Sequence, residues 1–541
     1  MTRKKGTAKL AASLEVEAGA PLDARDIVPT ESDKLDATNF PYPYIGMKTT
    51  VLSTGKTYRL IDMDVTDPDS WVEDSGETAI RQDISNIKAA IGYSDDLSNL
   101  DIVGLRIDSS NRQFKRLGCA SSWSPYWPSV IPKFDDVPAY KFRRCTVSDD
   151  GTVTAYAGDP GYTEDGSAGQ VMVEIPCIYY KVVPLERNTI YRTYNHEHDS
   201  KTVQGYAIPC VNIYATTTER PGFKVHPAFV RADGTIASKL YVGAFKAIVY
   251  EKSTDTYYGG IGTPTDYSQS VLCSVVRGLE PCLNLQWDKV ETLASNRGTG
   301  WHAYTSKVHS LLTMLMLIEC DGDSMSVYSG FSGVYNTDGQ NYVGDTAGMG
   351  NSTGTATVNR RTGAAPTDGN ASFSWRGIEN PYGESPTCLQ DMLIQSSDWY
   401  YESDSSTGKY GTQMPFVSNN FTYGFGGQID LNNYTAIGID TAFSYSGDGI
   451  GTGYAHVLGY PDITKEQFDY FMLPVLTTDY AESAAFNTYN TRSADGFKRL
   501  GAGGWYDDAI NYKVGMLAYS DVNAWASNSV FATRLIYIPN N

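Results

Sequence analysis

The side chains best suited to contact a ligand are concentrated near the C-terminus, between positions 505 and 528. This stretch mixes Trp and Tyr, which give large and rigid contact area, with Asp, Asn and Ser, which exchange hydrogen bonds. An aromatic ring stacks on the face of a sugar while neighbouring carboxylates accept hydrogen bonds from its hydroxyls. The residues predicted to form this recognition surface are Trp505, Tyr506, Asp507, Asp508, Asn511, Tyr512, Tyr519, Asp521, Asn523, Trp525 and Asn528.

The alternative for the two tryptophans of this stretch is burial. The pattern allows one of Trp505 and Trp525 to belong to the hydrophobic core. The polar residues on both sides of them favour at least partial exposure. The pattern therefore predicts binding of a polar ligand such as a glycan.

No catalytic motif accompanies the predicted surface. The sequence has no serine nucleophile elbow, no Walker A loop and no dinucleotide-binding glycine motif between a strand and a helix. A carboxylate pair for glycoside cleavage is recognised in space and not in sequence, so a glycan-cleaving enzyme stays open as an alternative. We predict a protein that is not an enzyme.

Two groups of residues have metal-binding side chains. The run 196–199 (His-Glu-His-Asp) lacks the HExxH or paired Cys/His spacing of zinc sites. Asp321, Asp323 and Asp448 lie beside glycines in loops where Ca²⁺ could bind, without the regular spacing of a calcium loop. We predict no cofactor, with Ca²⁺ as the alternative.

Composition narrows the class of protein. The chain has 541 residues, enough for about three or four domains of roughly 150 residues each. Its 39 Tyr and 51 Gly are typical of β structure with long ordered loops. A net charge of -19 excludes a nucleic-acid-binding role for the chain as a whole, because such binding needs a basic stripe.

Eight cysteines are scattered without a CxxC pair. The N-terminus lacks the apolar core of a secretory signal. We therefore expect a protein made in a cytoplasm, with its cysteines mostly reduced and buried. The longest aliphatic run, 311–318, is too short to span a bilayer, so we expect no membrane partner.

The N-terminal hundred residues divide into three segments. Residues 1–38 read as a flexible or docking arm, and residues 39–78 as a small β attachment domain with a hairpin turn at 53–56. Residues 79–100 carry an apolar stripe at helical spacing, which predicts a short stalk. The stripe suits self-association, and packing on a neighbouring domain is the alternative.

The rest of the chain predicts an α+β, β-rich fold. Residues 101–164 form a β-rich intermediate region, in which Asp150-Gly151 and Asp165-Gly166 mark hairpin turns. Strands are expected at 170–181, 223–230 and 239–250. Helices are expected at 287–297, at 304–320 with Thr305 as its cap, and at 464–473. The pentapeptide FKRLG occurs at 114–118 and again at 497–501, which is too short to establish a repeat.

Six motifs in one order resemble a known family. They are VEIPCIYYK (173–181), PGFKVHPAFV (221–230), YVGAFKA (241–247), SNRGTGWHAYTSKVHSLLTMLMLIE (295–319), SWRGIENPYGE (374–384) and ATRLIYIP (532–539). The chain resembles phage virion proteins whose C-terminal domain is a C-type-lectin-like fold of the formylglycine-generating-enzyme type. Target proteins of diversity-generating retroelements share this fold. The resemblance covers roughly residues 165–541, and the region around PYPYIGM more weakly resembles fibre attachment domains.

The resemblance implies a specific architecture. Two main helices flank a sheet, long loops fill residues 330–461, and the first and last strands pair, which predicts contact between 171–180 and 535–539. The variable region of the retroelement targets corresponds to residues 504–529, the predicted surface. The segment 375–380 corresponds to buried scaffold. Its neighbouring Arg, Glu and Asn side chains by themselves predict a buried polar network, in which Glu379 is one candidate partner of Arg376. The family's enzymes use two late cysteines, and none follows Cys388 here, so we expect no oxidase activity.

The functional expectation is a structural virion protein, a head or tail fibre or appendage. Its N-terminal region would dock on other virion proteins, and its C-terminal lectin-like domain would bind a host-surface glycan or protein receptor. By the resemblance and the helical stripe we expect a homotrimer located in the virion. The alternatives are a purely structural capsid or tail decoration protein and a glycan-cleaving fibre enzyme.

Overall fold

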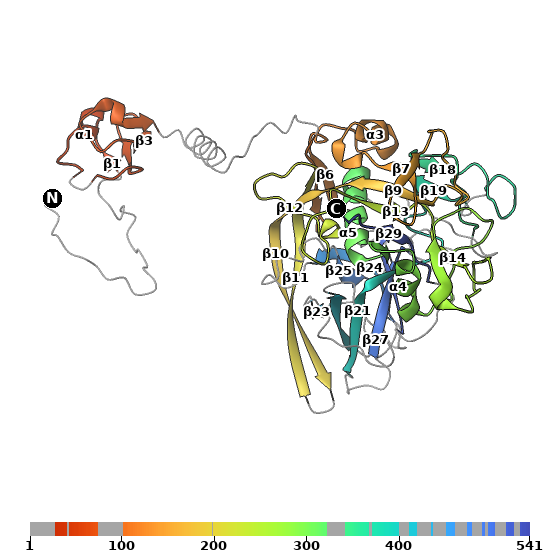
Figure 1. Cartoon of the computed structure of the whole chain (residues 1–541). Coiled ribbons are helices and arrows are strands. Elements are labelled where there is room, and N and C mark those ends of the chain that lie inside the picture. The colour runs from red at the N-terminus through yellow and green to blue at the C-terminus, as the bar shows by residue number, and fades with distance from the viewer. Residues whose placement is uncertain are drawn as a thin grey trace. The chain divides into compact units, whose positions relative to one another are not determined.

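A computed structural model of the chain describes residues 27–40, 43–73, 101–196, 199–321, 341–366, 371–399, 410–418, 434–436, 451–459, 473–478, 489–492, 496–503, 515–523 and 531–540. The chain forms two compact units, Met1–Asp95 and Asp96–Asn541 (Figure 1). Within the described residues the fold is β-rich, with few α-helices.

The smaller unit is built on a four-stranded sheet with the order β1-β2-β3-β4. Gly55, in the β2–β3 turn, has φ +69°, a left-handed conformation that glycine adopts at little cost. The hairpin predicted around 53–56 is therefore confirmed. The elements are β1 (Ile27–Val28), α1 (Glu31–Lys34), β2 (Lys48–Val51), β3 (Lys56–Leu60) and β4 (Trp71–Glu73).

Among the described residues of the smaller unit, seven apolar side chains are buried together: Val28, Phe40, Met47, Val51, Leu60, Val65 and Trp71. Thr30 caps α1, with its hydroxyl accepting from Asp33 N and the Asp33 carboxylate accepting from Thr30 N. These reciprocal bonds form a capping box that begins the helix.

The larger unit contains a sheet of thirteen described strands. Its longest hairpin, β10–β11, extends away from the body of this unit (Figure 1). The strands are β5 (Val103–Asp108), β6 (Gln113–Gly118), β10 (Tyr179–His196), β11 (Asp199–Thr216), β12 (Lys224–Val225), β21 (Thr387–Trp399), β22 (Tyr410–Ser418), β23 (Tyr434–Ala436), β24 (Gly451–Gly459), β25 (Leu473–Thr478), β26 (Tyr489–Arg492), β27 (Gly496–Gly503) and β28 (Gly515–Asn523).

A six-stranded sheet joins distant parts of the sequence in the order β17-β29-β13-β9-β7-β8. Its strands are β7 (Arg143–Val147), β8 (Val153–Tyr156), β9 (Gln170–Pro176), β13 (Lys239–Gly243), β17 (Trp301–Ala303) and β29 (Leu535–Tyr537). Two smaller sheets contain β14 (Ile248–Glu251), β15 (Thr256–Tyr258) and β16 (Ser270–Cys273), and β18 (Gly354–Thr355), β19 (Phe373–Trp375) and β20 (Ile378–Glu379).

The last strand does not pair directly with β9. β29 pairs with β13, where Tyr537 lies opposite Tyr241, and with β17 on its other side. The predicted pairing of 171–180 with 535–539 is therefore wrong, although β9 and β29 belong to one sheet. β13 runs antiparallel to both strands, and its apolar residues Leu240 and Val242 are fully buried between them. The C-terminal strand is nevertheless held on both edges.

The two main helices are present as predicted. α4 spans Trp287–Ser295, and α5 spans Ser306–Cys320 with Thr305 as its cap. The Thr305 hydroxyl accepts a hydrogen bond from Val308 N at 3.3 Å. Every residue of α5 except Lys307 is buried, so its apolar surface is wider than the predicted stripe. The helix lies in the middle of the larger unit (Figure 1).

A third helix of this unit, α3 (Trp127–Phe134), was not predicted. Pro128 and Pro132 make the segment read as a turn. Pro128 lies in the first turn, where a missing N–H costs nothing, and only Pro132 is internal. α3 packs against α5.

Several predicted strands have different bounds. The segment 170–181 is two strands, because the chain leaves β9 at Pro176 and enters another sheet at Tyr179. The segment 223–230 contains only the two-residue strand β12, which is followed by the 3-10 helix Pro227–Phe229. The segment 239–250 is split between β13 and β14. Gly151 lies in the β7–β8 hairpin turn as predicted, whereas Asp165-Gly166 connects strands that are not neighbours.

The predicted stalk at 79–100 and the helix at 464–472 lie outside the described residues, and Leu473 begins β25. No disulfide joins the eight cysteines, all of which fall in described parts of the chain. No helix among the described residues is long and apolar enough to cross a lipid bilayer.

Candidate functional site

The predicted recognition surface is described only in part. Its residues at 505–512 and at 525 and 528 lie outside the described residues. Tyr519, Asp521 and Asn523 belong to β28, where they lie opposite Ala502, Leu500 and Lys498 of β27. The β27 residues opposite Asp521 and Tyr519, namely Leu500 and Ala502, have buried side chains. The structure therefore fixes the strand register of three predicted residues.

The ends of this segment are described and lie close together. The segment 504–530 follows the end of β27 at Gly503, contains β28, and is followed by the described residues 531–540. Gly503 O accepts a hydrogen bond from Gly383 N at 2.5 Å, and Ala532 N donates to Pro386 O at 2.9 Å. Both ends of the segment 504–530 are thus bonded to one short stretch of chain, residues 380–386, called here the anchor loop.

A second set of backbone contacts strengthens this attachment. Thr387 at the start of β21 pairs with Ala502 and also forms a parallel bridge to Ala532. Cys388 N donates to Ala532 O at 2.9 Å. The start of β21 therefore lies between the outgoing and the returning chain and ties both to the same sheet.

Two glycines make this close approach feasible. A Cβ on Gly501 would lie 2.8 Å from the Phe531 ring and 2.9 Å from Pro386. Gly503 has φ +104°, and a Cβ there would lie 3.1 Å from Tyr382 Cα. Larger residues at either position would push the ends of the segment away from the anchor loop.

The anchor loop is unusual because it is buried. Every residue from 372 to 392 is buried, whereas most loops lie on the surface. Asn380 and Glu384 have φ +41° and +66°. Left-handed backbone at a residue other than glycine costs roughly 1–2 kcal/mol. The surrounding contacts must hold the loop in this shape.

Two buried cations supply those contacts. Lys246 Nζ donates to Gly383 O at 2.6 Å and to Ser385 O at 2.8 Å. The Arg534 guanidinium donates to Asn380 O at 2.5 Å and to Glu379 O. Loop carbonyls that are removed from water need such donors, because an unpaired buried carbonyl is costly.

The charge on Lys246 is balanced by Glu384, whose Oε2 lies 3.6 Å from Nζ. Burial lowers the pKa of Lys246 and raises that of Glu384, while their mutual attraction opposes both shifts. Glu384 also accepts from Asn380 Nδ2 at 3.3 Å. The anchor loop therefore carries its own internal counter-charge.

The neighbouring segment 375–380 is a buried polar network, as predicted, but the predicted Arg376–Glu379 pair is wrong. Arg376 donates to Glu319 of α5 at 2.8 Å and to Asp135 at 2.9 Å. Glu379 accepts from Gly344 N at 2.8 Å and from Thr346 N at 2.7 Å. Arg376 follows β19 at the hairpin tip and Glu379 lies in β20, so the two side chains leave in different directions.

Lys246, Arg534 and Glu384 were not singled out from the sequence. Each stands as a charged residue inside an otherwise apolar or glycine-rich motif: YVGAFKA, ATRLIYIP and NPYGE. A charge in such a setting is rarely buried without a partner. A charged residue within an apolar or glycine-rich motif was therefore the sequence feature that indicated burial. It could not show which residues pair.

A serine–histidine contact also occurs in the interior. Ser310 Oγ lies 3.3 Å from His226 Nε2, and His226 Nδ1 accepts from Ala228 N at 3.3 Å. The histidine is fully buried, which lowers its pKa to about 3. A group with so low a pKa is a weak base near neutral pH. We interpret the pair as the cap of the 3-10 helix Pro227–Phe229.

The residues considered as alternative metal ligands do not gather into a described site. His196 and Asp199 end the paired strands of the β10–β11 hairpin, while Glu197, His198, Asp323 and Asp448 lie outside the described residues. Asp321 forms the C-cap of α5 with φ +65°. Within the described residues, no group of three or more His, Cys, Asp or Glu side chains is arranged to hold a metal ion.

Comparison of the chain with models of known protein families and with curated protein sequences gives no match.

Proposed function

We propose that this chain is a virion fibre or appendage protein and that it binds a polar host-surface ligand, a glycan or a glycosylated protein, through the segment 504–530. The observation that carries the proposal is the attachment of both ends of this segment to the buried anchor loop, through Gly503–Gly383 and Ala532–Pro386. Binding residues are commonly carried on loops that a rigid scaffold positions.

The composition of the segment supports this assignment. Trp505, Tyr512 and Trp525 offer rings for stacking, and the surrounding Asp and Asn side chains offer hydrogen bonds to hydroxyl groups. The smaller unit at the N-terminus is compact by itself, which suits a separate attachment function toward other virion proteins. In this proposal the larger unit binds and does not cleave its ligand.

The test replaces Trp505, Tyr512 and Trp525 together by Ala in the full chain and measures adsorption of particles to host cells. An aromatic residue at the centre of an interface contributes about 2 kcal/mol or more, so adsorption should fall at least about tenfold. Tyr126→Ala is the matched control, because Tyr126 is 57% exposed and lies before α3, far from this segment in the sequence. The thermal unfolding midpoint of each variant shows whether it is folded.

Other outcomes identify the alternatives. Unchanged adsorption by a folded triple variant would reject the host-binding role. A segment that antibodies reach on the purified protein and not on the particle would instead favour a decoration protein whose segment contacts other virion subunits. Shortened host polysaccharide after incubation with the purified protein would indicate a glycan-cleaving enzyme.

A further inference from the structure

Two basic residues lie opposite each other on the outer face of the larger sheet. In this part of the larger unit β6, β5, β11 and β10 are paired side by side, and β6, β11 and β10 are seen on one side of the unit in Figure 1. Lys115 of β6 lies opposite Arg106 of β5, and Arg106 lies opposite Asn212 of β11. Lys115 and Arg106 are exposed, whereas Leu105 and Ile107, on either side of Arg106 in β5, are buried. The basic pair therefore belongs to the face of the sheet that is turned toward solvent.

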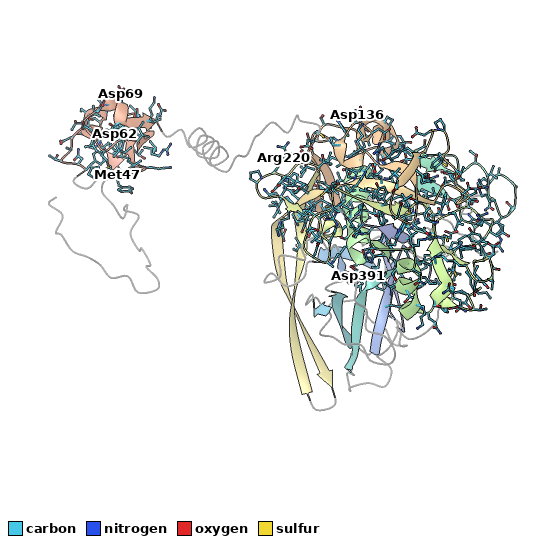
Figure 2. All side chains as sticks on the ribbon, in the orientation of Figure 1. Met47, Asp62, Asp69, Asp136, Arg220 and Asp391 are labelled. Atoms are coloured by element: carbon cyan, nitrogen blue, oxygen red, sulfur yellow. The ribbon has the colours of Figure 1, made fainter. Side chains whose placement is uncertain are left out.

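The pairing of Lys115 with Arg106 is unfavourable for the fold. Like charges directly opposite each other on neighbouring strands destabilise a sheet. The chain has 62 acidic and 43 basic residues, so acidic partners are in excess. Within the described residues neither cation forms an ion pair, and Arg106 donates to the neutral Asn212 Oδ1 at 3.0 Å. Arg220, labelled in Figure 2, is by contrast paired with Asp101 at 2.8 Å. The basic pair thus suits an anion that is not part of this chain.

An aromatic ring lies in the next row of the same face. Gly104 of β5 lies opposite Tyr214 of β11, and Tyr214 lies opposite Lys181 of β10. A Cβ on Gly104 would lie 2.7 Å from Tyr214 Cδ1, so the ring rests against the backbone of β5. Phe223 packs against the Tyr214 ring, with 6.5 Å between the ring centroids. The ring is therefore held in place beside the basic pair, where it offers rigid contact area to a ligand.

An acidic row lies on the other side of the basic pair. Asp108 of β5 lies opposite Cys210 of β11, which lies opposite Glu186 of β10. A continuous polyanion such as a nucleic acid would be repelled by these carboxylates. A ligand whose negative charges are separated by hydroxyl groups avoids this repulsion, because hydroxyls donate hydrogen bonds to carboxylates. Acidic saccharides have this spacing of charges and hydroxyls.

We propose that the outer face of β6, β5, β11 and β10 binds an acidic saccharide. Its carboxylate or phosphate group lies between Lys115 and Arg106, where it replaces their repulsion by charge-assisted hydrogen bonds. The sugar ring packs on Tyr214, and its hydroxyls bond to Asn212 and Asp108. This surface contains none of the residues of the segment 504–530, so the inference does not rest on the proposed host-binding function.

The first experiment titrates the full chain with an oligomer of galacturonic acid in a calorimeter. The oligomer should bind, and added salt should weaken binding, because salt screens charges on an exposed surface. Arg106→Ala combined with Lys115→Ala should lower the affinity at least about tenfold, since both charged contacts are lost. Lys252→Ala is the matched control, because Lys252 is also exposed and follows β14. The control should bind as the wild type does.

Thermal unfolding separates this role from a structural one. The double variant removes a repulsion between exposed side chains, so its unfolding midpoint should be no lower than that of the wild type. A lower midpoint would show that the two cations stabilise the sheet, and it would overturn the inference from their repulsion. The binding and salt dependence of the wild-type chain remain a test in that case.

Other ligands test the class of molecule that is bound. A neutral glucose oligomer should bind at least about tenfold more weakly than the galacturonic acid oligomer, because it lacks the anion. The proposal is overturned if neither the galacturonic acid oligomer nor a phosphorylated saccharide binds, or if binding survives in the double variant. Equal binding of inorganic phosphate or of a single-stranded oligonucleotide would also overturn it. The triple variant of Trp505, Tyr512 and Trp525 should bind the oligomer as the wild type does, which distinguishes this site from the segment 504–530.

Discussion

The ammonium nitrogen of Lys246 lies 3.6 Å from Glu384 Oε2, and both side chains are at most 3% exposed. The same ammonium donates to two carbonyls of the anchor loop, on either side of Glu384. A buried ion pair contributes little compared with an apolar pair of the same shape, but removing one partner leaves an uncompensated charge. Lys246 therefore supports the loop to which both ends of the segment 504–530 are attached.

The first prediction concerns loss of this cation. Lys246→Met should lower the free energy of unfolding of the larger unit by about 3–5 kcal/mol, because Glu384 and two loop carbonyls lose their donor. Denaturant unfolding measures the change. Lys239→Met is the matched control, since Lys239 pairs with Glu174 at 2.8 Å but its side chain is 38% exposed. The control should cost at most about 1 kcal/mol.

A double variant separates the charge from the hydrogen bonds. Lys246→Met combined with Glu384→Gln removes both charges, so it should be more stable than the sum of the two single effects predicts. Strict additivity would mean that the two side chains do not stabilise each other. In that case the loss of charge balance at Glu384 would not explain the instability of the Lys246→Met variant.

The second prediction concerns the contact between the ends of the segment 504–530. Gly501→Ala places a Cβ within 3 Å of both Phe531 and Pro386. Overpacking of this kind costs typically about 1–3 kcal/mol. Phe531→Leu should relieve part of that cost. The thermal unfolding midpoint of the double variant should therefore be higher than the sum of the two single effects predicts. An unaffected Gly501→Ala protein would show that this contact is not tight.

Local features of this chain were predictable from sequence, because their causes lie within a few residues. The glycine in the turn at 53–56 and the Thr305 cap before an apolar run each indicate one element, and both elements are present. The failure at α3 is also local. The region 101–164 was predicted to be β-rich, and the prolines at 128 and 132 disguise the helix, although a proline in the first helical turn is compatible with one.

Long-range pairing could not be predicted in the same way. β9 and β29 are both apolar strands, but nothing within either one specifies that β13 lies between them. Arg376 and Glu379 are close in sequence, yet each finds its partner elsewhere, Arg376 at Glu319 and Glu379 at Thr346. For the candidate site, sequence indicated the composition of 505–528 and did not identify the anchor loop.

The short FKRLG repeat has a structural counterpart. Both copies lie in β-strands, β6 and β27, and in each the arginine is buried, with Arg116 3% and Arg499 2% exposed. Arg116 donates to Glu319 O at the end of α5, and Arg499 lies over the Phe531 ring at 5.8 Å. Each copy therefore forms part of a strand and places its arginine in the interior. The five-residue match alone could not establish this structural similarity.

The third prediction concerns the cap of α5. Thr305→Ala removes the hydroxyl that accepts from Val308 N, which should cost about 1 kcal/mol in the free energy of unfolding. Thr305→Ser keeps that oxygen and should cost much less. Equal destabilisation by both substitutions would show that the Thr305 methyl group contributes more than the cap.

The last prediction concerns acid stability at Glu251. Its carboxylate accepts hydrogen bonds from the hydroxyls of Thr265, Tyr258 and Ser253 and from two backbone N–H groups. These bonds, foremost those from Thr265, lower the pKa of Glu251 from 4.5 to about 2. Because the folded pKa lies below the unfolded one, this group stabilises the fold fully above pH 4.5. That contribution is lost as the pH falls from 4.5 toward 2.

Glu251→Gln should therefore lower the thermal midpoint at neutral pH and flatten its decline across that acid range. The neutral amide presents an NH₂ group to donors that need an acceptor, so the variant is destabilised at every pH. Glu219→Gln, at an exposed position of the same unit, should follow the wild-type profile. A Glu251→Gln protein whose midpoint falls as steeply as that of the wild type between pH 4.5 and 2 would assign the acid sensitivity to other carboxylates.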